Sequence, residues 1–134
     1  MIALPDAGWW HELHTWEPES TLAFYNRAMG WEFEAIDMAR DAGYWLARKD
    51  GKPVCGIFEL TQPVYNGVPS HWMAYLSVGN MRDTLGETKR AGGSVLRGPV
   101  RIEGLGCLAI VSDVQGVFIG LFEPALHMEI ARAA

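Results

Sequence analysis

The chain has 134 residues, enough for one domain with a real hydrophobic core, and its 49% hydrophobic and 20% charged residues are ordinary for a globular protein. A net charge of −5 without any basic run argues against nucleic acid or an anionic membrane as partner. Because neither a signal peptide nor an apolar stretch long enough to span a membrane is visible, we expect a cytoplasmic protein.

The first half of the chain predicts a strand, a helix and three further strands. The first strand covers about residues 9–16, and the helix begins at Pro18, where a proline fits the first turn, and ends at Gly30. Asp50-Gly51 predicts a tight hairpin turn. Residues 62–70, with their prolines and an Asn-Gly pair, are the expected linker. The other three strands are expected at Trp31–Met38, Gly43–Arg48 and Lys52–Leu60.

The second half predicts the same order of elements. Asn80 is a good N-cap for a helix that runs to about Ala91 and stops at two glycines. Residues 101–106 read as a loop, and the alanine-rich tail at 125–134 as a short helix. Strands are expected at Trp72–Val78, Ser94–Arg97, Cys107–Ser112 and Val117–Phe122.

The second half also repeats the first in sequence. With an offset of 63 positions, seven of the 22 residues from Trp9 to Gly30 are identical to their counterparts, where average composition gives about one or two by chance. One residue further out of register, Gly56-Ile57-Phe58-Glu59 matches Gly120-Leu121-Phe122-Glu123. Two copies are too few for a solenoid. We therefore expect one domain built from two similar modules.

These elements predict an α+β fold. Module one covers about residues 9–61 and module two about residues 71–124. A helix between the first strand and three more requires a mixed sheet with crossover and hairpin connections. With both helices on one face, the other face of each sheet is free to curve around a central cavity shared by the modules.

Short segments occur along residues 9–124 in a recognisable order and spacing. They are Trp10-His11-Glu12-Leu13, Phe24-Tyr25, Gly30-Trp31, His71-Trp72-Met73-Ala74-Tyr75, Asn80, Gly98-Pro99, Gly106, Ala109, Asp113, Gln115-Gly116 and Phe122-Glu123-Pro124. Together they resemble the glyoxalase/bleomycin-resistance proteins, the vicinal oxygen chelate (VOC) superfamily. The resemblance implies paired βαβββ modules around a funnel-shaped cavity, often in a homodimer. It does not fix the reaction, because this fold hosts lyases, dioxygenases, epimerases, thiol transferases and drug-binding proteins.

Metal-dependent members of this family carry one ligand on the first and one on the last strand of each module. Transferred by motif spacing, the four positions fall on Trp10, Gly56, Met73 and Gly120. These residue types do not ligate a hard divalent ion, so we expect no metal and no cofactor. One alternative register stays open, in which Glu59 faces the cavity as a metal ligand, whereas the repeat pairs it with Glu123 near the strand end.

The histidines and cysteines suggest no other metal or nucleophilic site. His11 and His14 lie three apart on one strand and so point to opposite faces, and we expect His71, at a strand edge, to be solvated. Cys55 and Cys107 lack CxxC spacing, and we expect both to be reduced packing residues rather than a disulfide.

Strand alternation then selects the side chains that line the cavity. Leu13 and Leu76 have the opposite parity and are expected to pack against the helices. Gly56 and Gly120 would leave room for a ligand to approach. The alternative is that the aromatic rings of this face simply fill the core. The expected lining residues are Trp10, Glu12, His14, Val54, Gly56, Phe58, Met73, Tyr75, Ser77, Phe118, Gly120 and Phe122.

An aromatic pocket with Glu12, His14 and Tyr75 as its polar groups suits a small, flat, apolar or aromatic molecule. Our first hypothesis is a protein that binds such a ligand in a metal-free cavity. The second is a glyoxalase-like lyase or isomerase with Glu12 as general base, assisted by His14 or Tyr75. A metal-dependent lyase or dioxygenase would require a different register. Glu12 can equally anchor the ligand or order the pocket.

Overall fold

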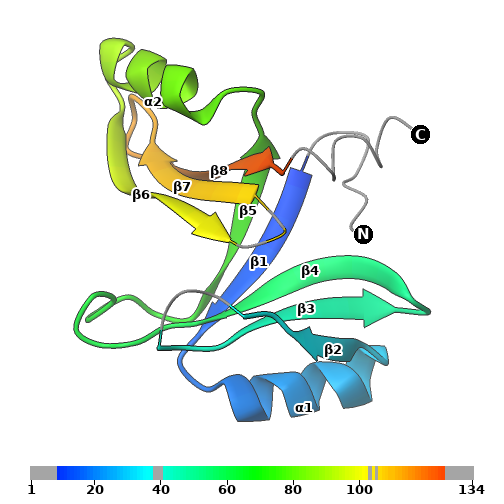
Figure 1. Cartoon of the computed structure of the whole chain (residues 1–134). Coiled ribbons are helices and arrows are strands. Elements are labelled where there is room, and N and C mark those ends of the chain that lie inside the picture. Colours follow the sequence, from blue (N-terminus) through cyan, green and yellow to red (C-terminus); the bar gives the residue numbers. More distant parts are fainter. Residues whose placement is uncertain (1–8, 38–40, 103, 105, 126–134) are drawn as a thin grey trace. The chain divides into compact units, whose positions relative to one another are not determined.

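The computed structural model describes residues 9–37, 41–102, 104 and 106–125. These residues form two helices and eight strands, which confirms the predicted α+β class (Figure 1). The predicted helix in the tail falls outside them. None of the helices in these ranges has the length and apolar character needed to span a membrane. The elements are β1 (Trp9–Thr15), α1 (Pro18–Met29), β2 (Glu32–Ala35), β3 (Tyr44–Lys49), β4 (Lys52–Glu59), β5 (His71–Ser77), α2 (Met81–Arg90), β6 (Ser94–Ile102), β7 (Gly106–Ser112) and β8 (Phe118–Pro124).

The chain divides into two compact units. The first unit comprises residues 11–73, and the second unit comprises residues 1–10 and 74–134. The strand order is β2-β3-β4-β1 in the first unit and β5-β8-β7-β6 in the second. In each, the first and last strands of the βαβββ sequence pair in parallel and the others pair antiparallel. This is the mixture of crossover and hairpin connections that the sequence predicts.

The strand registers agree with the sequence repeat. In the first unit β1 pairs with β4 so that Glu12 lies opposite Gly56. In the second unit β5 pairs with β8 so that Tyr75 lies opposite Gly120. Tyr75 is 63 positions after Glu12, and Gly120 is 64 positions after Gly56. The two units therefore align at equivalent positions, and the second has one additional residue between its first and last strands.

Local signals in the sequence account for the ends of the helices. Pro18 occupies the first turn of α1, and Gly30 ends it in the left-handed conformation, with φ of 72°. The Asn80 side chain accepts a hydrogen bond from the backbone N–H of Asp83 and caps α2 as predicted. Asp50 and Gly51 both have positive φ, as a tight hairpin turn requires.

Sequence reasoning fails most clearly at β6. The prediction ends this strand at Arg97 and assigns residues 101–106 to a loop. In the structure β6 continues to Ile102, with irregular register on either side of Arg97. Pro99 is exposed on this outer strand of the second unit, a position where the missing N–H removes no ladder hydrogen bond from the interior of a sheet.

Each unit packs its helix against one face of its sheet (Figure 1). In the first unit Leu13 belongs to a buried cluster with Cys55 and Ile57, against which Leu22 and Tyr25 of α1 pack. The core of the second unit consists of Met81, Leu85, Ala109, Val111 and Leu121. The predicted parity of Leu13 is thus confirmed, and the side chains of alternate parity on β1 face away from α1.

The two cysteines are free thiols. Burial, together with the smaller effect of the negative charge of Glu12, raises the pKa of the Cys55 thiol to about 12. Burial also raises the pKa of Cys107, as does Glu123, while Arg101 lowers it. Cys55 is therefore protonated and chemically inert at neutral pH, as expected of a packing residue.

The raised pKa of Cys55 predicts a loss of stability in alkali. Between the ordinary thiol pKa of 9.0 and about 12 the folded chain retains a proton that the unfolded chain loses, so stability falls as the pH rises through this window. From about pH 8 to about pH 10 the free energy of unfolding of the native chain should fall by about 1.4 kcal/mol more than that of Cys55→Ala. Urea unfolding at both pH values measures this, and Ile57→Val is the control in the same cluster. Equal losses in the native chain and Cys55→Ala would contradict the assignment.

Candidate functional site

A buried carboxylate–imidazole pair lies on β1. Glu12 and His14 are two residues apart and so share the face of the strand that points away from α1. Their exposed fractions are 0% and 3%, and the imidazole Nε2–H donates to the Glu12 Oε1 at 2.8 Å. His11 has the opposite parity, as predicted, and its side chain is exposed. A carboxylate this deeply buried is costly unless it is hydrogen-bonded, and His14 provides a charge-assisted partner.

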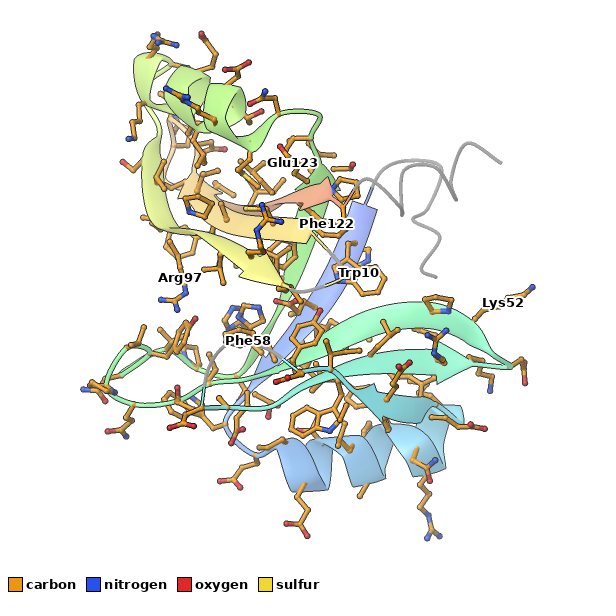
Figure 2. All side chains as sticks on the ribbon, in the orientation of Figure 1. Trp10, Lys52, Phe58, Arg97, Phe122 and Glu123 are labelled. Atoms are coloured by element: carbon orange, nitrogen blue, oxygen red, sulfur yellow. The ribbon has the colours of Figure 1, made fainter. Side chains whose placement is uncertain are left out.

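The parallel pairing of β1 with β4 sets the neighbours of this pair. Gly56 lies beside Glu12, and Phe58 lies beside His14. The rings of Phe58 and His14 are 4.8 Å apart and inclined by 32°. Figure 2 shows Phe58 on the side of its sheet away from α1. The structure therefore brings together four of the predicted site residues: Glu12, His14, Gly56 and Phe58.

Two further rings extend this group, and sequence reasoning missed both. The His71 ring lies 4.8 Å from that of His14, and its Nδ1–H donates to the Pro69 carbonyl at 2.7 Å. His71 is thus only partly exposed, and its parity with Met73 on β5 places it on the predicted cavity face. Tyr65 lies in the linker, where only a turn was predicted, yet it is buried and its ring is 5.5 Å from Phe58.

The glycines of the predicted site have a reason other than ligand approach. A Cβ added at Gly56 would fall well inside van der Waals distance of the Tyr44 hydroxyl and 3.3 Å from the Glu12 Oε2. A Cβ at Gly120 would overlap the ring of Tyr75. In each unit a tyrosine of the chain thus fills the space that the glycine leaves open.

The other predicted site residues differ in their surroundings. Tyr75 and Phe122 are buried in the second unit, and Trp10 and Met73 are buried near the points where the chain divides into units. Phe118, at the start of β8, is 62% exposed, so the chain does not enclose its ring as a pocket wall would require.

Glu59 and Glu123, which occupy equivalent positions in the two copies of the repeat, each accept a hydrogen bond from a backbone N–H group. Glu59 accepts the N–H of Gly43, and Glu123 accepts the N–H of Met81 at the start of α2. Glu59 shares the parity of Ile57, which packs on the α1 side, so the alternative register that turned Glu59 toward the cavity is not favoured. In the described ranges, no three His, Cys, Asp or Glu side chains are grouped so that they could hold a metal ion.

The amino-acid sequence is similar to those of several named proteins. No family model matches the chain. A Mycobacterium tuberculosis protein with the provisional name glyoxylase CFP32 is 33% identical over 116 residues, which is 87% of this chain and 43% of that protein. The anthracycline biosynthesis protein DauV of Streptomyces sp. strain C5 is 24% identical over 123 residues, 84% of this chain and 45% of that protein. The chain thus spans less than half the length of these relatives.

Solved structures share the fold. The methylmalonyl-CoA epimerase from Mycobacterium tuberculosis superposes with a TM-score of 0.64 at 12% identity and covers 97% of both chains. The Streptomyces coelicolor methylmalonyl-CoA epimerase in complex with 2-nitronate-propionyl-CoA gives a TM-score of 0.64 at 16% identity, covering 94% of this chain and 97% of that one. The fold is that of the glyoxalase and bleomycin-resistance proteins. This is the fold that the motifs of the chain predict through their resemblance to the VOC superfamily.

Because Tyr44 fills the space over Gly56, we predict that an alanine at this position destabilises the fold. Gly56→Ala should lower the free energy of unfolding by about 1–3 kcal/mol, because the added Cβ overlaps Tyr44 in a packed interior. Gly79→Ala is the matched control, since Gly79 is exposed and a Cβ there meets no atom within 4 Å. That variant should change stability by less than about 0.5 kcal/mol. Urea unfolding compares the two, and equal stabilities would refute the packing described here.

Proposed function

We propose that the chain is a glyoxalase-like proton-transfer enzyme acting on a small enolisable carbonyl compound, with Glu12 as the base. The observation that carries the proposal is the buried hydrogen bond between Glu12 and His14. A carboxylate held by a hydrogen bond from an imidazole has the arrangement of a general base with its orienting partner. The provisional name glyoxylase of one relative and the epimerase activity named for the structural neighbours support the same class of reaction.

Proton transfer at a carbon atom requires a base and a second group that orients this base. Glu12 takes a proton from a carbon next to the carbonyl, the electron pair of the broken C–H bond passes into an enolate, and the carboxylic acid returns the proton to that carbon or to a neighbouring one. His14 orients the carboxylate through its Nε2–H, as a positioning residue. Tyr75 keeps its proposed role as an assisting hydroxyl.

The aromatic rings around the pair favour a flat, apolar substrate. Phe58 and His71 lie against the ring of His14, and Tyr65 packs edge-on against Phe58. Trp10, Met73 and Phe122 keep their proposed binding roles. The relation to an anthracycline biosynthesis protein supports an aromatic ketone. The structural neighbours support a carbonyl compound such as methylmalonyl-CoA, the ligand named for one of them.

The proposal assigns no metal to the reaction. Tryptophan, methionine and two glycines occupy the positions that correspond to the ligands of metal-dependent relatives, and these types do not fit a hard divalent ion. The space at two of those positions, Gly56 and Gly120, is filled by the rings of Tyr44 and Tyr75, which supports the same conclusion.

A second candidate is a binding protein without catalysis, as our first hypothesis has it. The full burial of Glu12 favours it, because a carboxylate whose Oε1 is hydrogen-bonded to His14 can order the face without moving a proton. The two candidates differ in what happens to the carbon-bound hydrogen of a bound ligand.

Solvent deuterium exchange tests the enzyme proposal. In deuterium oxide the native chain should accelerate exchange of the acidic C–H of methylmalonyl-CoA or of an aromatic ketone such as 1-tetralone, and Glu12→Gln should lower that rate by about 100-fold or more. Glu59→Gln is the control, since Glu59 packs on the other face and a glutamine can still accept the Gly43 N–H.

Binding measurements with the same ligands distinguish a binding protein from an enzyme. If Glu12→Gln binds them within a few fold of the native chain and the native chain does not accelerate exchange, the enzyme proposal is wrong and the binding function stands. Loss of exchange in Glu59→Gln as well would show that the effect is structural.

A further inference from the structure

A pocket in the second unit lies outside the proposed site. It is open, about 580 Å³ in volume, and lies between α2 and the strands β6, β7 and β8. Arg82, Gly86 and Lys89 line it from the helix, and Pro99, Cys107 and Glu123 line it from the strands. This volume falls in the range of sites that take small organic molecules.

Two cations on α2 border the pocket. Arg82 and Lys89 are seven residues apart, two helical turns, and so lie on the same side of the helix. Within the described part of the chain neither side chain makes a hydrogen bond or an ion pair, whereas Arg90 on the same helix binds Glu87 at 2.7 Å. The pocket therefore offers two positive groups for a ligand.

The carboxylate in the pocket does not cancel them. Glu123 lies on β8 (Figure 2), and its Oε1 accepts the N–H of Met81, so that this negative charge faces the positive end of the α2 dipole. The nearby Cys107 is neutral as a protonated thiol. With two cations against one carboxylate, the net charge of the lining residues is positive.

Gly86 lies between Arg82 and Lys89 on α2, and it has no side chain to cover the helix backbone at this position. Glycine is a poor helix former, and Gly86 lies in the middle of α2 without the positive φ that would require it. A Cβ there would meet Arg90 at 3.5 Å, an ordinary contact, so the packing of the chain does not require a glycine. The absent side chain would let a ligand approach the backbone of α2 closely at this point.

We propose that this pocket binds a small organic anion. Its phosphate or carboxylate group lies between Arg82 and Lys89, and its apolar part lies over Gly86 toward Pro99 and Cys107. The site is independent of Glu12 and His14 and adds a second ligand to the proposed function.

Titration of the full chain with phenyl phosphate and with benzoate tests the site, with amide chemical shifts as the readout. Either anion should shift the amides of Gly86 and Lys89 in a saturable way, inorganic phosphate should bind more weakly, and phenol should not bind. If neither phenyl phosphate nor benzoate perturbs the residues of this pocket, the proposal is wrong.

Variants on α2 separate the site from general charge effects. The double variant Arg82→Gln/Lys89→Gln should weaken binding of the anion about tenfold or more, because both charge-assisted contacts are lost. Arg90→Gln, which removes an equal charge already paired with Glu87, should change it by less than about twofold. Gly86→Ala should raise the unfolding temperature and yet weaken binding. Unchanged affinity in the double variant or in Gly86→Ala would overturn the proposal.

Discussion

The parallel pairing of β1 with β4 is the constraint on which the candidate site depends. It places Glu12 opposite Gly56 and His14 opposite Phe58, so one register fixes the carboxylate, the imidazole and the ring beside it. Gly56 accommodates Tyr44 as well as Glu12, because a larger residue there would displace both. A slip of one residue would turn Glu12 toward the α1 side, where Leu13, Cys55 and Ile57 form an apolar core.

The duplication preserves this geometry while the chemistry differs between the units. The counterpart of Glu12 is Tyr75, opposite Gly120, and the counterpart of His14 is Ser77. In the second unit the tyrosine fills the space over the glycine, so that position is occupied by packing. A carboxylate–imidazole pair at these positions thus occurs in the first unit alone, and this asymmetry is what makes Glu12 the candidate for chemistry rather than a structural residue of the repeat.

Much of the fold can be predicted because its signals are local. Pro18, Gly30 and Asn80 determine helix ends through backbone chemistry, and the repeat predicts the paired registers. The site is less accessible to such reasoning. Alternation on one strand puts Glu12 and His14 on the same face, but their hydrogen bond depends on side-chain rotamers, and the place of Tyr65 depends on how a turn-rich linker folds back. The strand β6 continues past its predicted end at Arg97 through Gly98-Pro99, since an outer strand tolerates a proline that a central strand does not.

The central claim is that His14 donates its Nε2–H to a fully buried Glu12, and nitrogen-15 NMR of the histidine side chains tests it most directly. The account predicts that His14 carries its proton on Nε2, that this proton exchanges slowly with water, and that Glu12→Gln alters its resonance while the exposed His11 is unaffected. A His14 side chain that exchanges as fast as that of His11 and does not respond to Glu12→Gln would contradict the account.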